Sequence, residues 1–286
     1  MSEEFRCAAA SARDLEPLAG TAPTEASWLF VEYAGAWGRQ AVTDSRLPAR
    51  VRDYLAGLTG HRVQLIRRYG GSGGSGVRLF RADLTGRRHV QSALIDEVGE
   101  LREIDQLPWT DHRDPLWLVC TNGSRDRCCT EFGRPIAARL AERWPAETWE
   151  TTHLGGHRFS GTLLALPSGL VLGRLDPGLA VAAVEAILAG RFPTGLARGR
   201  AGWTPAAQLA ELHLRADRAD LGLEEVRLVG DDGAHVTLAT SEGAWTFEVA
   251  AEPGPPRRQS CGDTLAKTTI SHRVTAVRRA ERGSRT

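Results

Sequence analysis

One short apolar segment, Leu116–Cys120, most constrains how this chain can fold. Its residues, Leu-Trp-Leu-Val-Cys, are apolar without interruption. A strand that is apolar on both faces is typical of a parallel sheet covered on both sides, and parallel strands need crossover connections, usually helices. Residues 135–144 repeat apolar side chains at helical spacing, and residues 148–152 form the next strand candidate. The segment therefore predicts an α/β protein.

The residues that follow complete this unit. Pro167-Ser168-Gly169 separates two apolar strand segments and indicates a hairpin. A helix comes next, with Pro177 in its first turn and Gly190 after its end. The resulting order, β-α-β-β-β-α, is that of a small thioredoxin-like α/β sandwich. The predicted hairpin strands are residues 162–166 and 170–174, and the predicted helix is residues 177–188.

The first hundred residues repeat the start of this order, so the prediction extends to two thioredoxin-like units in tandem. Strand segments rich in aromatic and β-branched residues flank a helix that begins at Pro48 and ends before Gly60. Residues 1–27 contain several breakers and predict irregular structure. The predicted strands are residues 28–33, 63–68, 77–82 and 89–95, and the predicted helix is residues 48–58.

Beyond residue 200 the pattern changes to a helix followed by a small antiparallel β extension. Its strand segments alternate apolar and polar residues, with Gly-containing turns between them. The predicted helix is residues 205–215, the strands are 226–229, 235–240 and 245–249, and residues 278–286 form a frayed basic tail.

These patterns divide the chain into three parts. We expect an N-terminal α/β unit over residues 1–105, a thioredoxin-like domain with the candidate site over 106–195, and the helix, meander and tail over 196–286.

Composition argues for a folded protein and against two kinds of partner. The 286 residues are 42% hydrophobic and 25% charged, which is ordinary for a globular protein. A formal net charge of +1 provides no general attraction for nucleic acid, and no apolar run is long enough for a membrane span. The first residues lack the basic and apolar stretches of a secretory signal. We therefore expect a cytoplasmic location.

The cysteines point to a metal or redox site. They number five, and three of them, Cys120, Cys128 and Cys129, fall within ten residues, which is unlike a secreted disulfide framework. They end or follow the buried strand, while His153 and His157 follow the next strand. Neighbouring parallel strands bring such loops together at one edge of the sheet. Thiolates with imidazoles suit zinc, or the iron of an iron–sulfur cluster.

Spacing narrows the roles of these residues. Two glycines between the histidines predict a tight loop that turns both rings toward one ion. The adjacent Cys128 and Cys129 cannot project equally toward one site, so one is expected to be a ligand and the other a packing residue or spare thiol. Cys7 and Cys261 are expected to be structural, although Cys261 lies near the site if the C-terminal segment folds back.

The Cys120-x8-Cys129 segment, with Arg125-Asp126 inside it, and the His153-Leu-Gly-Gly-His157 segment carry a family resemblance. They resemble the sucrase/ferredoxin-like family, which is similar to thioredoxin-fold ferredoxins. Weaker matches extend the resemblance over residues 6–265: Trp28-Leu-Phe-Val-Glu32, Trp37-Gly38, Ser45-Arg46-Leu47-Pro48, Leu166-Pro167-Ser168-Gly169 and Ser260-Cys261-Gly262.

The resemblance implies a [2Fe–2S] cluster held by Cys120, Cys129, His153 and His157. Cys128 stands where relatives often have a basic residue, so this chain departs from the family there. Because other branches of thioredoxin-fold ferredoxins use four cysteines, the resemblance leaves Cys128 as an alternative ligand. The implied function is electron transfer with a redox partner protein. The resemblance thus favours an electron carrier over a stand-alone enzyme. Two further hypotheses stay open: a thioredoxin-like thiol redox protein that reacts through Cys128 or Cys129, and a non-redox binding module with a structural Cys2His2 zinc site.

Overall fold

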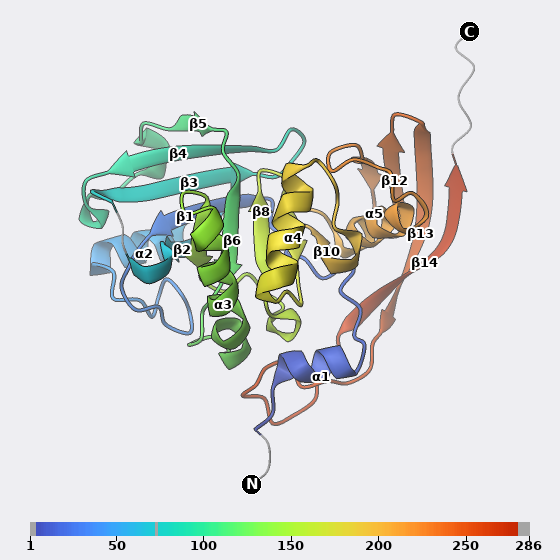
Figure 1. Cartoon of the computed structure of the whole chain (residues 1–286), viewed down its shortest axis with the longest axis horizontal. Coiled ribbons are helices and arrows are strands. Elements are labelled where there is room, and N and C mark those ends of the chain that lie inside the picture. Colours follow the sequence, from blue (N-terminus) through green and yellow to red (C-terminus); the bar gives the residue numbers. More distant parts are fainter. Residues whose placement is uncertain (1–3, 72–73, 280–286) are drawn as a thin grey trace.

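The computed structural model describes residues 4–71 and 74–279. Within them the strands form a ten-stranded mixed sheet and a four-stranded antiparallel sheet (Figure 1). The main helices are α1 (Cys7–Arg13), α2 (Ala49–Gly57), α3 (Arg127–Arg143), α4 (Pro177–Leu188) and α5 (Pro205–Asp217). The large sheet contains β1 (Ser27–Glu32), β2 (Arg62–Arg67), β3 (Val77–Asp83), β4 (His89–Ile95), β5 (Thr110–His112), β6 (Leu116–Cys120), β7 (Thr148–Thr151), β8 (Leu163–Leu166), β9 (Leu170–Leu172) and β10 (Ala197–Arg200). The small sheet contains β11 (Arg227–Asp231), β12 (His235–Thr240), β13 (Gly243–Pro253) and β14 (Ile270–Arg279). The predicted mixed α/β class with a C-terminal antiparallel extension is confirmed.

Strand β6 lies inside the large sheet and is buried on both faces. It pairs in parallel with β7 and antiparallel with β8. Trp117 and Val119 pack into a core shared with α3 and α4, whereas Leu118 and Cys120 pack into a second core on the opposite face. In Figure 1 the two helices lie side by side over the near face of this part of the sheet. Burial on both faces explains why the segment is apolar without interruption.

The two halves of the large sheet have the same topology. The strand order is β10-β9-β8-β6-β7-β2-β1-β3-β4-β5. In each half a helix joins a parallel pair, β1 with β2 or β6 with β7, and antiparallel strands extend it. The halves meet where β2 pairs antiparallel with β7, so they form one continuous sheet. The likeness to thioredoxin and the three-part division of the chain stay predictions.

Helix α3 corrects the predicted start at residue 135. It begins at Arg127, because the Asp126 carboxylate accepts a hydrogen bond from the backbone N–H of Cys128 at 3.0 Å and caps the helix. Pro135, which we expected in the first turn, lies inside the helix. Burial of the first turns against the sheet outweighs the backbone hydrogen bond that this proline cannot make. Cys128 and Cys129 are therefore helical residues and not loop residues.

Both ends of the chain are more regular than predicted. Residues 7–13, expected to be irregular, form α1, whose Cys7 and Ala8 pack against Cys128. Part of the predicted frayed tail belongs to β14, where Arg278 and Arg279 pair with β13. Residues 280–286 lie outside the described residues. Long-range partners stabilise both elements, so local sequence patterns did not indicate them.

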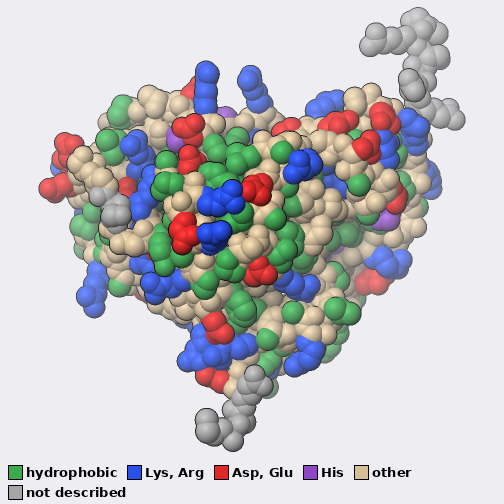
Figure 2. Space-filling view, in the orientation of Figure 1, with side chains coloured by type: hydrophobic (Ala, Val, Ile, Leu, Met, Phe, Trp, Pro, Cys, Tyr) green, Lys and Arg blue, Asp and Glu red, His purple; other side chains and the backbone are tan. Residues whose placement is uncertain are grey.

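Charge is mixed over the surface shown in Figure 2, where Lys and Arg side chains alternate with Asp and Glu. Among residues 4–71 and 74–279, no helix combines the length and apolar character that crossing a membrane requires.

A buried ion-pair group fixes α5, which packs on the small sheet, to the large sheet. Glu211 of α5 lies 3.0 Å from the guanidinium of Arg200 on β10 and 3.0 Å from that of Arg215. All three side chains are at most 1% exposed. One carboxylate therefore pairs with two buried guanidinium groups, and its loss would leave both without this partner.

We expect Glu211→Ala to lower the free energy of unfolding by about 3–5 kcal/mol, measured by urea denaturation, because removing one partner leaves buried charge uncompensated. Glu185→Ala is the control, since Glu185 pairs with Arg143 at 2.7 Å on the surface, with side chains 47% and 42% exposed. That change should cost less than about 1 kcal/mol. Equal losses in the two variants would contradict the role given to the buried group.

Candidate metal centre

The four predicted ligands come from the carboxyl ends of β6 and β7 and from the segments that follow. Cys120 is the last residue of β6, and its register partner Thr151 ends β7, two residues before His153. Cys129 lies in the first turn of α3, and His157 begins a short 3-10 helix. The structure therefore brings the two predicted segments together, as the parallel pairing requires.

Distances between donor atoms define one compact group. The Sγ atoms of Cys129 and Cys120 lie 3.6 Å and 3.9 Å from Nδ1 of His153. The Nε2 atom of the same ring lies 3.3 Å from Nδ1 of His157. Cys120, Cys129 and His153 each offer a ligand atom within 4.8 Å of the others, with both cysteines buried. Two thiols and the His153 imidazole thus form the compact group, and His157 lies beside it, against the other ring nitrogen of His153.

The loop between the histidines turns as the two glycines predicted. Gly155 and Gly156 have φ values of +91° and +66°, which residues with a side chain rarely adopt. A Cβ atom on Gly156 would lie 2.3 Å from the Arg198 guanidinium. Glycine therefore permits both the turn and the close approach of this arginine.

The thiols of Cys120 and Cys129 have pKa values shifted in opposite directions. A hydrogen bond with Cys129 is the largest cause that lowers the pKa of the Cys120 thiol well below its ordinary value. The same contact, together with burial, raises the pKa of Cys129. One proton between two sulfurs is the expected state of a close thiol pair, and it makes Cys120 the first thiolate available to a metal.

His157 is held in a defined tautomer. Its Nε2 atom lies 2.5 Å from the carbonyl oxygen of Gln259. A carbonyl can only accept, so Nε2 carries the hydrogen and the lone pair of Nδ1 faces His153. Burial lowers the pKa of this imidazole and keeps it neutral, as a ligand must be. A backbone carbonyl on the outer N–H is the usual support of a metal-binding histidine.

Arg198 of β10 places a buried positive charge beside the site. It is 1% exposed, donates to the carbonyl oxygen of Gly155 at 2.9 Å and to the hydroxyl of Thr21 at 3.1 Å. Burial, with the nearby Arg62, lowers its pKa to about 9, while Cys120 and Cys129 act in the opposite direction. Within the described part of the chain, no carboxylate lies within 4.0 Å of it. The anionic group of the site that acts on this guanidinium is therefore the Cys120 thiolate.

A cavity of about 350 Å³ opens beside His157. Its lining includes Glu16, Gly156, Arg158 and Gln259. Arg158 is buried and paired with Glu16 at 2.6 Å. The histidine side of the site is thus the side nearest to solvent.

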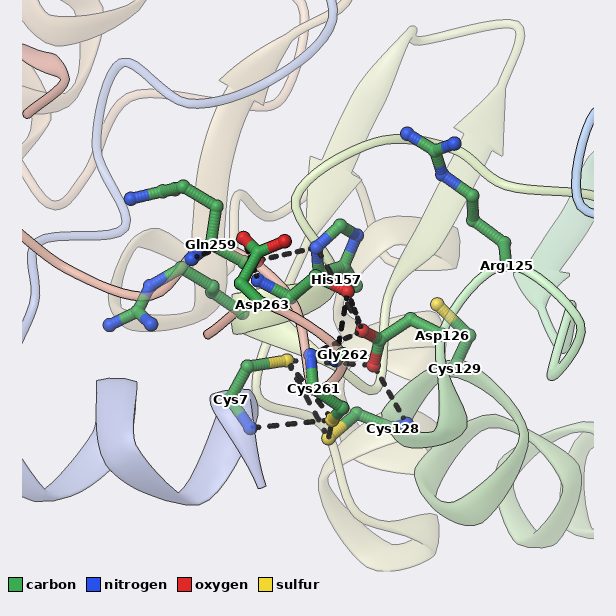
Figure 3. Close-up of polar contacts among 12 residues, drawn as sticks. Cys7, Arg125, Asp126, Cys128, Cys129, His157, Gln259, Cys261, Gly262 and Asp263 are labelled. Carbon is green, nitrogen blue, oxygen red and sulfur yellow. Dashed lines mark hydrogen bonds and ion pairs between the residues drawn. The ribbon is translucent and has the colours of Figure 1, made fainter. Parts of the chain in front are cut away.

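Cys128, the alternative ligand, belongs to a different group in this structure. Its Sγ atom lies 3.3 Å from Sγ of Cys261 and 3.7 Å from Sγ of Cys7 (Figure 3). The C-terminal segment does fold back, and Cys261 joins Cys7 and not the four predicted ligands. Neither Arg198 nor the Gln259 carbonyl was predicted as part of the site, because each comes from a segment far along the chain from the ligand it supports.

The fold and the Cys/His group define a mixed α/β protein with a candidate metal centre at one edge of a parallel strand pair. The family model for sucrase/ferredoxin-like proteins matches residues 18–199, and the chain belongs to that family. No curated protein and no solved structure gives a significant match. The family resemblance carried by the two ligand segments is confirmed.

Gly133 of α3 sets the distance between the helix and the end of β6. A Cβ atom there would lie 2.0 Å from the carbonyl oxygen of Cys120. We expect Gly133→Ala to lower the free energy of unfolding by about 1–3 kcal/mol, because neither backbone can move freely. Gly57→Ala is the control, since a Cβ at this helical position meets nothing within 4 Å. Urea denaturation of both variants tests this, and a neutral Gly133→Ala would contradict it.

Proposed function

We propose that this protein transfers electrons by means of a [2Fe–2S] cluster held by Cys120, Cys129, His153 and His157. The observation that carries the proposal is the group of two buried thiols and the His153 imidazole, with the His157 imidazole beside it, fixed by the Gln259 carbonyl. We propose also that each half of the large sheet is a thioredoxin-like unit, of which the second holds the ligands.

The residues present fit such a cluster in donor chemistry and in charge. Thiolate and imidazole ligands together hold [2Fe–2S] centres of the Rieske type. The pair of thiols, one with a lowered pKa, supplies anionic sulfur, and Arg198 supplies a buried positive charge with no carboxylate within 4.0 Å among the described residues. When bound, the cluster would supply reversible one-electron chemistry. The protein's part is to hold the His157 imidazole neutral and to exclude water from the sulfurs.

Imidazole ligands should give a higher reduction potential than four thiolates would. Neutral nitrogen donors leave less negative charge to oppose the incoming electron, which raises the potential. Arg198 should act in the same direction, because a positive charge favours the more negative, reduced form. We propose that a redox partner protein approaches near His157, where the cavity brings solvent closest to the ligands.

A reducing compartment suits this reading. All five cysteines are free thiols in the structure, although several sulfurs lie close together. A cytoplasmic location, proposed from the sequence, would keep them reduced.

A second candidate function rests on the same thiol pair. Cys120 and Cys129 share a proton, as the two thiols of a disulfide oxidoreductase do. Both are buried, however, which leaves no open path for a disulfide substrate. Thiol–disulfide exchange that persists after complete removal of iron would favour this alternative.

Anaerobically purified protein should contain about two irons and two sulfides per chain, the composition of one such cluster. His157→Cys should lower the reduction potential on the order of 100 mV, because a thiolate replaces a neutral imidazole. Potentiometric titration followed by visible absorption measures the shift. His89→Cys, at an exposed position on β4, is the control and should leave the potential unchanged. A colourless protein with one zinc bound to these four residues would refute the proposal.

Arg198→Met should lower the reduction potential by tens of millivolts. About 59 mV corresponds to 1.4 kcal/mol for one electron, and a buried charge near the site is worth about this much. Arg198→Lys keeps the charge and should retain most of the potential. The same potentiometric titration compares the two variants. Equal potentials for Met and Lys would show that the charge does not act on the site.

A further inference from the structure

A second group of thiols lies outside the proposed cluster site. Its members come from three distant parts of the chain: Cys7 from α1, Cys128 from the first turn of α3, and Cys261 from the segment between β13 and β14. The three sulfurs form a nearly equilateral triangle with sides of 3.3, 3.6 and 3.7 Å. Figure 3 shows the three side chains pointing toward one another below Asp126.

From this geometry we propose that Cys7, Cys128, Cys261 and Asp126 bind one zinc ion. Zinc prefers four ligands in a tetrahedron, with Zn–S distances of about 2.3 Å, so sulfur atoms around it lie about 3.8 Å apart. The observed triangle comes within a few tenths of an ångström of one face of that tetrahedron. A ring of three converging thiols without a metal would be an unusual use of buried sulfur.

Asp126 supplies the fourth position. Its Oδ1 atom lies 3.5 Å from Sγ of Cys7, and a tetrahedral site with one oxygen ligand would place them about 3.6 Å apart. Its Oδ2 atom accepts from the Ser260 hydroxyl and the Cys261 N–H at 2.8 Å each, and Oδ1 accepts from the Cys128 N–H at 3.0 Å, which leaves a second lone pair of Oδ1 for the metal. These bonds orient the carboxylate so that Oδ1 faces the thiols. Ligand atoms of all four residues lie within 4.8 Å of one another.

Burial and hydrogen bonding suit a closed structural site. Cys7 and Cys128 are fully buried, and Asp126 is 4% exposed. The backbone N–H of Cys7 donates to Sγ of Cys261 at 3.5 Å, which supports a thiolate there. The positive N-terminal end of α3 offsets part of the ligands' negative charge. Four protein ligands leave no open coordination position, as in zinc sites that stabilise a fold.

The proposed zinc site lies close to the segment that orients His157. Cys261 lies two residues from Gln259, whose carbonyl holds the outer nitrogen of His157. A metal bound to Cys261 would therefore hold the segment around Gln259 in place, and this segment orients His157, one predicted ligand of the neighbouring centre. The zinc ion would join both ends of the chain to α3 and act as a positioning element for that centre.

X-ray absorption at the zinc edge tests the proposal on the full-length protein, because this signal is specific for zinc whatever iron is bound. We expect one zinc per chain with three sulfur neighbours at about 2.3 Å and one oxygen neighbour at about 2.0–2.2 Å. Cys7→Ser and Cys261→Ser should each lose the zinc. Ala8→Ser, a neighbouring buried position on α1, is the matched control and should retain it.

Cys120→Ser separates this site from the other one. It should retain the zinc with all three sulfur neighbours, whatever happens to iron. A wild-type protein without zinc, a disulfide between two of the three cysteines, zinc with nitrogen neighbours, or zinc lost in Cys120→Ser would each overturn the proposal. If Cys7→Ser does not fold, Cys261→Ser decides, because its side chain is partly exposed and its loss disturbs packing less. Iron and sulfide content, measured on the same samples, reports separately on the proposed cluster.

Discussion

The carboxylate of Asp126 is the interaction on which the arrangement of both sites depends. One oxygen caps α3 through the N–H of Cys128, and the other binds the Ser260 hydroxyl and the Cys261 amide. These bonds outweigh the effect of burial and lower the pKa of the carboxyl to about 2, so the group stays charged. Because the cap fixes where α3 begins, it also fixes the directions in which the two cysteines of its first turn point.

Those directions explain how adjacent cysteines serve different sites. Successive residues of an α-helix are rotated by about 100° around its axis. Cys129 therefore faces β6 and His153, while Cys128 faces α1 and the C-terminal segment. The expectation that the pair could not point equally toward one site was right. The other cysteine was expected to be a packing residue or a spare thiol, and Cys128 does pack against Cys7 and Ala8. Its sulfur contacts with Cys7 and Cys261 were not predicted, because neither partner lies within a hundred residues of it in sequence.

The parts of the fold and of the candidate site that depend on short-range sequence patterns could be predicted from the sequence. Three features were predicted correctly: the apolar run of β6, the crossover to β7 and the glycine loop between the histidines. Together they place the four candidate ligands at one edge of the sheet. Patterns did not reveal α1, β14 or the early start of α3, since each depends on contacts far away in sequence or on a single cap. Arg198 and Gln259 were missed for the same reason, as each reaches the site only through the folded chain.

The segment between β13 and β14 contributes to the candidate site, although it lies outside the residues that match the family. The match to the family ends at residue 199, yet the carbonyl that fixes His157 belongs to residue 259. Residues 18–199 contain all four candidate ligands but neither Cys7 nor Cys261. The match to the family thus ends before the candidate site is closed, and in this chain the closure comes from two flanking segments that meet on the outside of α3.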